Sequence, residues 1–230
     1  MTEREKIFGR ISEALQAKAP LPGHGHDAIP AKVSGAAAPS SQARKWLPAV
    51  GESFDDRLAA FQKNAAELKA DFWLLNHADE ISGKLSELKQ AGHWKKIASH
   101  NSAATNAGCG GLGLPICWTD AGYDVKELES CDAGITECDA LVAQTGSVLL
   151  TSRSAGGRAL SVLPPHHVVL ARREQLVRDL PEAFALLKRT YAGNYPSMIS
   201  FVTGPSRTGD IERILVLGAH GPKRLSILCY

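Results

Sequence analysis

The chain has 230 residues, of which 44% are hydrophobic and 22% charged, and its formal net charge is +2. These values are typical of a globular protein with a sizeable core, and they give no electrostatic case for a nucleic-acid partner. No apolar run approaches the length that spans a bilayer, and the charged start does not resemble a signal peptide. We therefore expect a cytoplasmic protein with no membrane span.

The cysteines predict neither a metal site nor a cluster site in this chain. They are five in number, irregularly spaced, and never arranged as Cys-x-x-Cys: Cys109, Cys117, Cys131, Cys138 and Cys229. Reduced and mostly buried thiols are the expected state, since cysteine is among the most buried residue types. No cofactor is expected in this chain.

The N-terminal segment differs in composition from the rest. A capping box and an apolar stripe predict an amphipathic helix over residues 2–18. Residues 19–42 are rich in Pro, Gly, Ala and Ser without periodicity, which indicates a flexible linker. The expected division is an N-terminal helix and linker over 1–43 and a folded domain over 44–230.

Helices and strands alternate at the start of the folded domain. The predicted elements are a helix from Ser53 to about residue 70, a strand over 72–75, a helix over 81–92 with Gly92 as its C-cap, and a strand over 94–99. Such an alternation predicts a parallel sheet that helices cover.

Residues 108–113 match the pattern Gly-x-Gly-x-x-Gly, but their context argues against a dinucleotide-binding fingerprint. That fingerprint joins a strand directly to a helix whose first amides hold a pyrophosphate. Here the preceding strand ends well before Gly108, and residues 114–118 resemble a strand. We interpret the segment as a glycine-rich loop at the edge of the sheet.

Turns and short strands follow. A tight turn at 145–147 leads into a strand over 148–150, and a strand over 168–170 follows His166 and His167. Alternation along a strand would turn one of these histidines inward and the other outward. A helix from about residue 174 to 191 is expected to kink or divide at Pro181.

Two polar loops near the C-terminus stand between apolar strands. Residues 203–212 follow a predicted strand over 198–202, and residues 218–222 lie between apolar runs at 214–217 and 225–228. Loops of this kind on a rigid scaffold often bind ligands, and we expect them at the carboxyl ends of strands. The alternative left open is that their glycines and prolines only turn the chain.

Several motifs in this order resemble the LUD-domain family, in particular its lactate utilisation protein C members. The motifs are Gly134-Ile135-Thr136 with Asp139, the turn 145–147, Leu163-Pro164-Pro165-x-His167, the string 203–212, and 217–222. The resemblance covers residues 54–230. It implies a three-layer α/β fold with a mostly parallel sheet, like ribose-phosphate isomerase, glucosamine-phosphate deaminase and CoA transferases, preceded here by an N-terminal helix. Residues 108–113 are not part of the resemblance.

The resemblance also implies a role in oxidising L-lactate to pyruvate. It implies two partner proteins that carry iron–sulfur clusters, and a subunit without its own cluster. The sequence holds no motif for a flavin, nicotinamide or quinone acceptor. We therefore expect a non-redox subunit rather than a self-sufficient enzyme. The alternative is a free-standing enzyme, related to CoA transferases or formyltetrahydrofolate cyclo-ligase, that acts on a phosphorylated, CoA-linked or folate-linked substrate.

We expect the candidate site to bind a small carboxylate or phosphate. Arg207 can grip an anion with two parallel hydrogen bonds, turn amides can add donors, and His220 is the candidate general acid or base. Ser206 lacks the second glycine of a nucleophile elbow, so a capping hydroxyl is expected there. Asp210 is expected either to bind the ligand or to serve only as a cap or a partner for Arg207. The expected ligand-binding residues are Thr145, Gly146, Ser147, His167, Gly204, Pro205, Ser206, Arg207, Thr208, Asp210, Glu212, His220 and Gly221.

Overall fold

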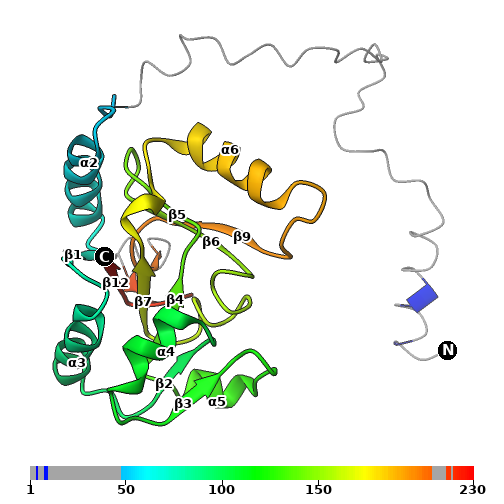
Figure 1. Ribbon diagram of the computed structural model, residues 1–230. Helices are drawn as coiled ribbons and strands as arrows, with labels where there is room; N and C mark the ends of the chain where they lie inside the picture. The colour runs from blue at the N-terminus through cyan, green and yellow to red at the C-terminus, as the bar shows by residue number, and fades with distance from the viewer. Residues whose placement is uncertain (1–3, 5–7, 10–47, 209–215, 219) are drawn as a thin grey trace. The chain divides into compact units, whose positions relative to one another are not determined.

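The computed structural model describes residues 4, 8–9, 48–208, 216–218 and 220–230 (Figure 1). The chain divides into two units, Met1–Trp46 and Leu47–Tyr230, and the second unit is described below. In the first unit, Arg4, Phe8 and Gly9 are helical; the rest of the predicted N-terminal helix and linker lies outside the described residues.

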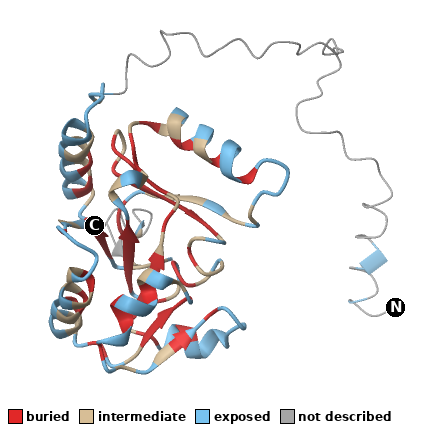
Figure 2. Cartoon of the chain, viewed as in Figure 1, coloured by how far each residue is buried: buried red, intermediate tan, exposed pale blue. Residues whose placement is uncertain are grey.

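A six-stranded sheet, parallel at every pairing, forms the centre of the second unit. In spatial order its strands are β1 (Asp71–Leu74), β12 (Arg224–Cys229), β7 (His166–Ala171), β4 (Ala133–Glu137), β2 (Ile97–Ser99) and β3 (Ile116–Trp118). Every residue of β7 is buried. This is the pattern of a parallel strand that is covered on both faces, and Figure 2 shows the buried residues gathered along these strands.

Helices cover both faces of this sheet, which makes three layers. On one face, α3 (Glu80–Gly92) and α4 (Ala103–Gly110) pack in the same core as Val168 and Leu170. On the other face, α2 (Phe54–Glu67) packs in the same core as Val169 and Ala171. A short helix, α5 (Val125–Glu129), packs against Ala98 of β2. The predicted three-layer α/β architecture is confirmed.

A second sheet was not predicted. Its order is β8 (Leu176–Val177), β5 (Ala140–Val142), β6 (Ser147–Thr151) and β9 (Ile199–Val202), and it is mostly antiparallel. Helix α6 (Leu180–Tyr191) packs against one face of it, while the other face joins the core under α2. An antiparallel pair of β10 (Arg207–Thr208) and β11 (Val216–Leu217) completes the strands of the described chain.

The helix predicted from residue 174 begins later and is not divided. Residues Arg173–Gln175 form a 3₁₀ turn and Leu176–Val177 form β8, so α6 starts at Leu180. The Asp179 side chain caps α6 by accepting from the amide of Glu182 at 2.9 Å. Pro181 therefore lies in the first turn, where a missing amide proton costs no helical hydrogen bond.

The glycine-rich loop predicted at 108–113 is also wrong in its first half. Residues Ala103–Gly110 form α4, which begins with a capping box between Ser102 and Thr105. A Cβ on Gly108 would lie 2.9 Å from Cγ2 of Ile81 and 3.0 Å from Cδ1 of Leu85. Glycine at 108 therefore lets α4 approach α3 closely, rather than forming a loop.

The preceding helix, α3, also ends differently from the prediction. Gly92 is its last residue, and His93 takes the left-handed C-cap conformation that was expected of Gly92, with φ of 51°. None of the helices among the described residues is long and apolar enough to cross a bilayer.

Candidate functional site

Two of the predicted site segments meet at the end of the second sheet. The Ser147 hydroxyl donates to Thr145 Oγ1 at 2.8 Å and lies 2.8 Å from Thr203 Oγ1. Hydrogen bonds between hydroxyl groups therefore join the turn at 145–147 to the start of the 203–212 segment, and the two lie side by side.

Glycines bring both segments close to α2 and its C-terminal end. Gly146 has φ of +65°, and a Cβ there would lie 2.9 Å from the amide nitrogen of Ala65. Gly204 has φ of +84°, and a Cβ there would lie 2.8 Å from the carbonyl oxygen of Leu68. The same Cβ position is 3.3 Å from Nη2 of Arg207, so the guanidinium group lies over the Gly204 turn. At both positions only glycine combines a positive φ with a backbone approach that leaves no room for a Cβ.

The two Gly-Pro loops are paired through Ser206. Its amide donates to the carbonyl oxygen of Pro222 at 2.9 Å, and its carbonyl oxygen accepts from the amide of Gly218 at 2.9 Å. Gly221 packs against the Ser206 side chain. Pro205 is buried, and the backbone of Thr208 belongs to β10. Asp210 and Glu212 lie outside the described residues.

His220 is exposed and lies on the wall of a cavity of about 430 Å³. Gly221, Lys223, Val162 and Pro165 contribute to the same cavity. Residues 218–223 lead into the amino end of β12, and Pro165 precedes the amino end of β7. The expectation that this loop sits at the carboxyl ends of strands is therefore wrong; it lies at the opposite edge of the sheet.

His166 and His167 are both buried, because helices and loops cover both faces of β7. The expectation of one inward and one outward ring is wrong for that reason. His166 Nε2 lies 2.8 Å from Ser226 Oγ, and His167 Nε2 lies 2.9 Å from Thr136 Oγ1. Burial lowers the pKa of His166 to about 4 and that of His167 to about 3, so both rings are neutral at neutral pH.

The carboxyl edge of the parallel sheet carries a group that the sequence reasoning missed. After β2 the chain runs to β3 on one side, whereas after β4 it continues to β7 on the other side. The point between β2 and β4 is therefore a topological switch point, where open α/β sheets bind ligands. His100 follows β2 and Glu137 ends β4, and their Nε2 and Oε2 atoms lie 3.7 Å apart.

Arg172, directly after β7, joins this pair. Its Nη1 lies 3.7 Å from Oε1 of Glu137, and its Nε donates to Glu174 at 2.8 Å. His100 is the main cause that lowers the pKa of Glu137; burial opposes this shift, while Ser102 and Arg172 add to it. Glu137 is therefore ionised at neutral pH. The signal that could have located these residues is a polar side chain at the end of a predicted parallel strand.

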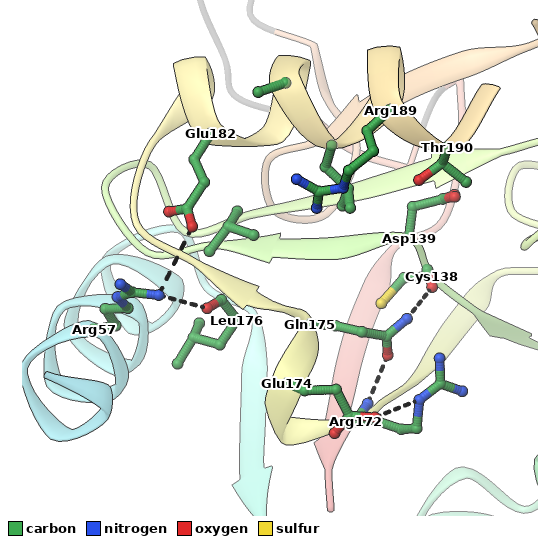
Figure 3. Close-up of a pocket in the computed structure, with 13 residues that line it drawn as sticks. Arg57, Cys138, Asp139, Arg172, Glu174, Gln175, Leu176, Glu182, Arg189 and Thr190 are labelled. Atoms are coloured by element: carbon green, nitrogen blue, oxygen red, sulfur yellow. Dashed lines mark hydrogen bonds and ion pairs between the residues drawn. The ribbon is translucent and has the colours of Figure 1, made fainter. Parts of the chain in front are cut away.

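Two cavities open at this edge, and Arg172 lines both. The smaller, about 300 Å³, lies between α3 and α4, and its walls include Ile81, Ala104, Ala107, Glu137, Arg172 and Tyr230. The larger, about 480 Å³, lies beside α6 and is polar (Figure 3).

Most polar groups of the larger cavity already have partners inside the protein. Figure 3 shows Arg57 directed at Glu182 and at the carbonyl oxygen of Leu176, at 3.9 and 3.5 Å. Asp139 accepts from the Ser154 hydroxyl at 2.5 Å and from the Tyr191 hydroxyl. These contacts hold α6 and β8 against the rest of the domain.

The described residues contain no group of three His, Cys, Asp or Glu side chains arranged to hold a metal ion. All five cysteines are free and buried. Burial raises the pKa of Cys109, Cys131 and Cys229 to about 11. These three are therefore thiols, not thiolates, at neutral pH.

The comparison with known families gives a match in the C-terminal part of the chain. The pattern of the LUD domain family matches residues 120–230. This match contains the turn at 145–147, both Gly-Pro loops and His220, together with Glu137 and Arg172 at the other edge of the sheet.

Curated relatives carry the name lactate utilization protein C. The chain is 36% identical over 112 residues to that of Shouchella clausii, a match that covers 48% of each chain. It is 32% identical to that of Deinococcus radiodurans, over 50% of this chain and 58% of the relative. The chain thus spans about half the length of these two relatives. The relative from Geobacillus kaustophilus is 26% identical over 86% of this chain and 88% of its own.

A solved structure shares the fold. It is the crystal structure of a DUF162 family protein from Deinococcus radiodurans, with a TM-score of 0.60 and 20% sequence identity. The match covers 78% of this chain and 99% of the other.

Proposed function

We propose, from the match of residues 120–230 to the LUD domain family, that this protein is a cytoplasmic, non-redox subunit of a system that oxidises L-lactate to pyruvate. The observation that supports the proposal most is the shared name of the curated relatives, lactate utilization protein C. Oxidation of lactate to pyruvate releases two electrons and two protons. In this proposal, iron–sulfur clusters in partner proteins receive the electrons.

The contribution of this chain is to bind a small carboxylate or phosphate at the C-terminal loops. His220 and Lys223 supply polar donors on the wall of the 430 Å³ cavity. Arg207 lies over the neighbouring Gly204 turn, and Ser206 ties that turn to the cavity loop. A guanidinium group and turn amides suit a carboxylate or phosphate.

Growth on lactate tests the role in lactate utilisation. Loss of the chain from its host should abolish growth on L-lactate but not on pyruvate, and the wild-type chain should restore it. A tagged chain should also retain iron–sulfur proteins from lactate-grown cells. Normal growth without the chain, together with no retained iron–sulfur protein, would refute the proposal.

Substitutions test the anion site separately. Arg207→Ala and His220→Ala should slow growth on lactate while leaving the chain folded. Lys188→Ala removes an exposed cation from helix α6, which does not line this cavity, and is the matched control. If growth on lactate is unchanged in both loop variants, the C-terminal loops do not bind the relevant anion.

A second candidate is a free-standing enzyme that acts on a phosphorylated, CoA-linked or folate-linked substrate. The observation that favours it is the His100–Glu137 pair at the switch point, because titratable side chains in such crevices often carry chemistry. This candidate predicts turnover by the purified chain without partner proteins. The subunit proposal predicts none.

A further inference from the structure

A cleft at the carboxyl ends of β4, β7 and β12 has the composition of a small-molecule site. Glu137 ends β4, Arg172 follows β7 and Tyr230 follows β12, so three strands each place one polar side chain at it. Its volume of about 300 Å³ lies at the lower end of the range for ligand pockets. It is a different cavity from the one that His220 and Gly221 line.

The walls between α3 and α4 are apolar. Ile81 comes from α3, and Ala103, Ala104 and Ala107 come from the first turns of α4. Small side chains on α4 leave the space open, since alanine fills little of the gap between the two helices. These walls suit a short aliphatic or otherwise apolar body.

The polar end of the cleft retains unused hydrogen-bonding capacity. The 3.7 Å separations of Glu137 from His100 and from Arg172 are longer than hydrogen bonds. The Glu137 carboxylate can therefore still accept from a ligand, and the terminal nitrogens of Arg172 can still donate to one. Burial raises the pKa of Tyr230, whose hydroxyl remains a donor at neutral pH.

We propose that this cleft binds a small organic acid that carries a hydroxyl or ammonium group beside its carboxylate. The carboxylate meets Arg172 and Tyr230, the hydroxyl or ammonium donates to Glu137, and the apolar body lies against Ala104 and Ala107. A phosphate dianion is disfavoured, because its second charge would approach the ionised Glu137 without a further cation. Lactate itself belongs to this class of acids, but the proposal rests on the residues of the cleft and places the ligand at a site other than the C-terminal loops.

Titration calorimetry on the purified full-length chain tests the ligand class with four probes. The probes are (S)-2-hydroxyhexanoate, (S)-2-aminohexanoate, hexanoate and inorganic phosphate. The hydroxy or the amino acid, whichever is preferred, should bind at least about tenfold more tightly than hexanoate, because only these probes donate to a charged acceptor. Phosphate should bind more weakly than either. No saturable binding of any organic probe, or tighter binding of phosphate, would overturn the proposal.

Variants locate the binding. Ala107→Leu fills the apolar part and should weaken binding at least about tenfold. Ala59→Leu makes the same change on an exposed face of α2, away from the cleft, and should bind as the wild type does. Glu137→Gln keeps the shape of the side chain but removes its charge. The ratio of the affinity for the preferred hydroxy or amino acid to that for hexanoate should then fall towards one. Wild-type affinity in both Ala107→Leu and Glu137→Gln would show that the probe binds elsewhere and would refute this cleft.

This experiment also separates the inference from the proposed function. His220→Ala should slow growth on lactate under the proposed function, and Ala107→Leu should weaken probe binding under the present one. If His220→Ala grows normally on lactate while Ala107→Leu still weakens probe binding, only the role of the C-terminal loops is refuted.

Discussion

Polar side chains have different roles at the amino ends and at the carboxyl ends of the parallel strands, which we call the amino edge and the carboxyl edge of the sheet. At the amino edge, His166 and His167 are buried, each bonded through Nε2 to a hydroxyl group. At the carboxyl edge, His100 and Arg172 each lie 3.7 Å from the Glu137 carboxylate, beside two cavities. A ring whose Nε2 is already bonded to a protein hydroxyl stabilises the fold, whereas the Glu137 carboxylate and the terminal nitrogens of Arg172 keep their capacity for a ligand.

Packing accounts for the closed amino edge. The ring of His166 contacts Trp94 edge-on, with centroids 5.2 Å apart and planes at 74°. Gly134, which pairs with His167 across β4 and β7, lets the carbonyl oxygen of Leu160 approach, since a Cβ would lie 2.5 Å from that oxygen. At the carboxyl edge two cavities are open among the described residues, and no such packing fills them.

Lowering the pH should have the largest effect, because it protonates the buried histidines of the amino edge and so lowers the free energy of unfolding. In the unfolded chain histidine has a pKa near 6.5, whereas His166 and His167 have pKa values of about 4 and about 3 in the fold. The unfolded state therefore binds more protons at intermediate pH. The stability from these neutral rings is complete above about pH 6.5 and is lost as pH falls towards 3, by roughly 3 kcal/mol or more for each ring.

Urea titrations at several pH values measure this loss. His167→Gln, which keeps a polar group near Thr136, should give a shallower fall in unfolding free energy than the wild type. His77→Gln changes an exposed histidine and should leave the slope unchanged. An identical slope in His167→Gln and wild type would contradict the assignment.

Overpacking the amino edge should have the next largest effect. Gly134→Val places a branched side chain against Leu160 and Pro164, and should lower the unfolding free energy by about 3 kcal/mol. Gly83→Ala, inside α3 with open space around it, should instead raise stability by about 0.5–1 kcal/mol. Denaturant midpoints of the two variants test both signs.

A change at the carboxyl edge should alter binding more than stability. Glu137 is partly exposed and its charge interactions are 3.7 Å long, so Glu137→Gln should cost only about 1 kcal/mol or less of unfolding free energy. The preference of this variant for the hydroxy or amino acid over hexanoate should nevertheless fall by about tenfold. A loss of stability as large as that of Gly134→Val would show that this edge, too, serves mainly the fold.

The smallest effect on stability should come from the exposed loop. His220→Ala should change the unfolding free energy by no more than about 0.5 kcal/mol, because the side chain is exposed. Under the proposed function it should still slow growth on lactate. A large loss of stability would assign His220 to the fold instead.

Local patterns in the sequence were enough to predict the parallel sheet. The strands predicted at 72–75, 94–99 and 168–170 correspond to β1, β2 and β7, and the stripe after Ser53 corresponds to α2. These signals succeed because burial on one or both faces imposes a period that each segment carries by itself. Gly146 was also recognisable as a turn residue, and its φ of +65° agrees.

Elements whose form depends on their neighbours were predicted wrongly. Gly108 reads as a loop residue, yet it lies in α4 because α3 needs a close approach there. Residues 174–177 fit a helical stripe, but pairing with β5 draws Leu176 and Val177 into the second sheet. Tertiary contact outweighed local preference in both places.

The sequence by itself determined the α/β class, the buried and reduced cysteines, and the resemblance that the LUD domain match over residues 120–230 confirms. Only the tertiary structure decided which polar side chains share a site. His100 and Glu137 are far apart in the chain, and they meet because the strand order places β4 beside β2 at the switch point. Strand order follows from how whole faces pack, and no local pattern in the sequence records it.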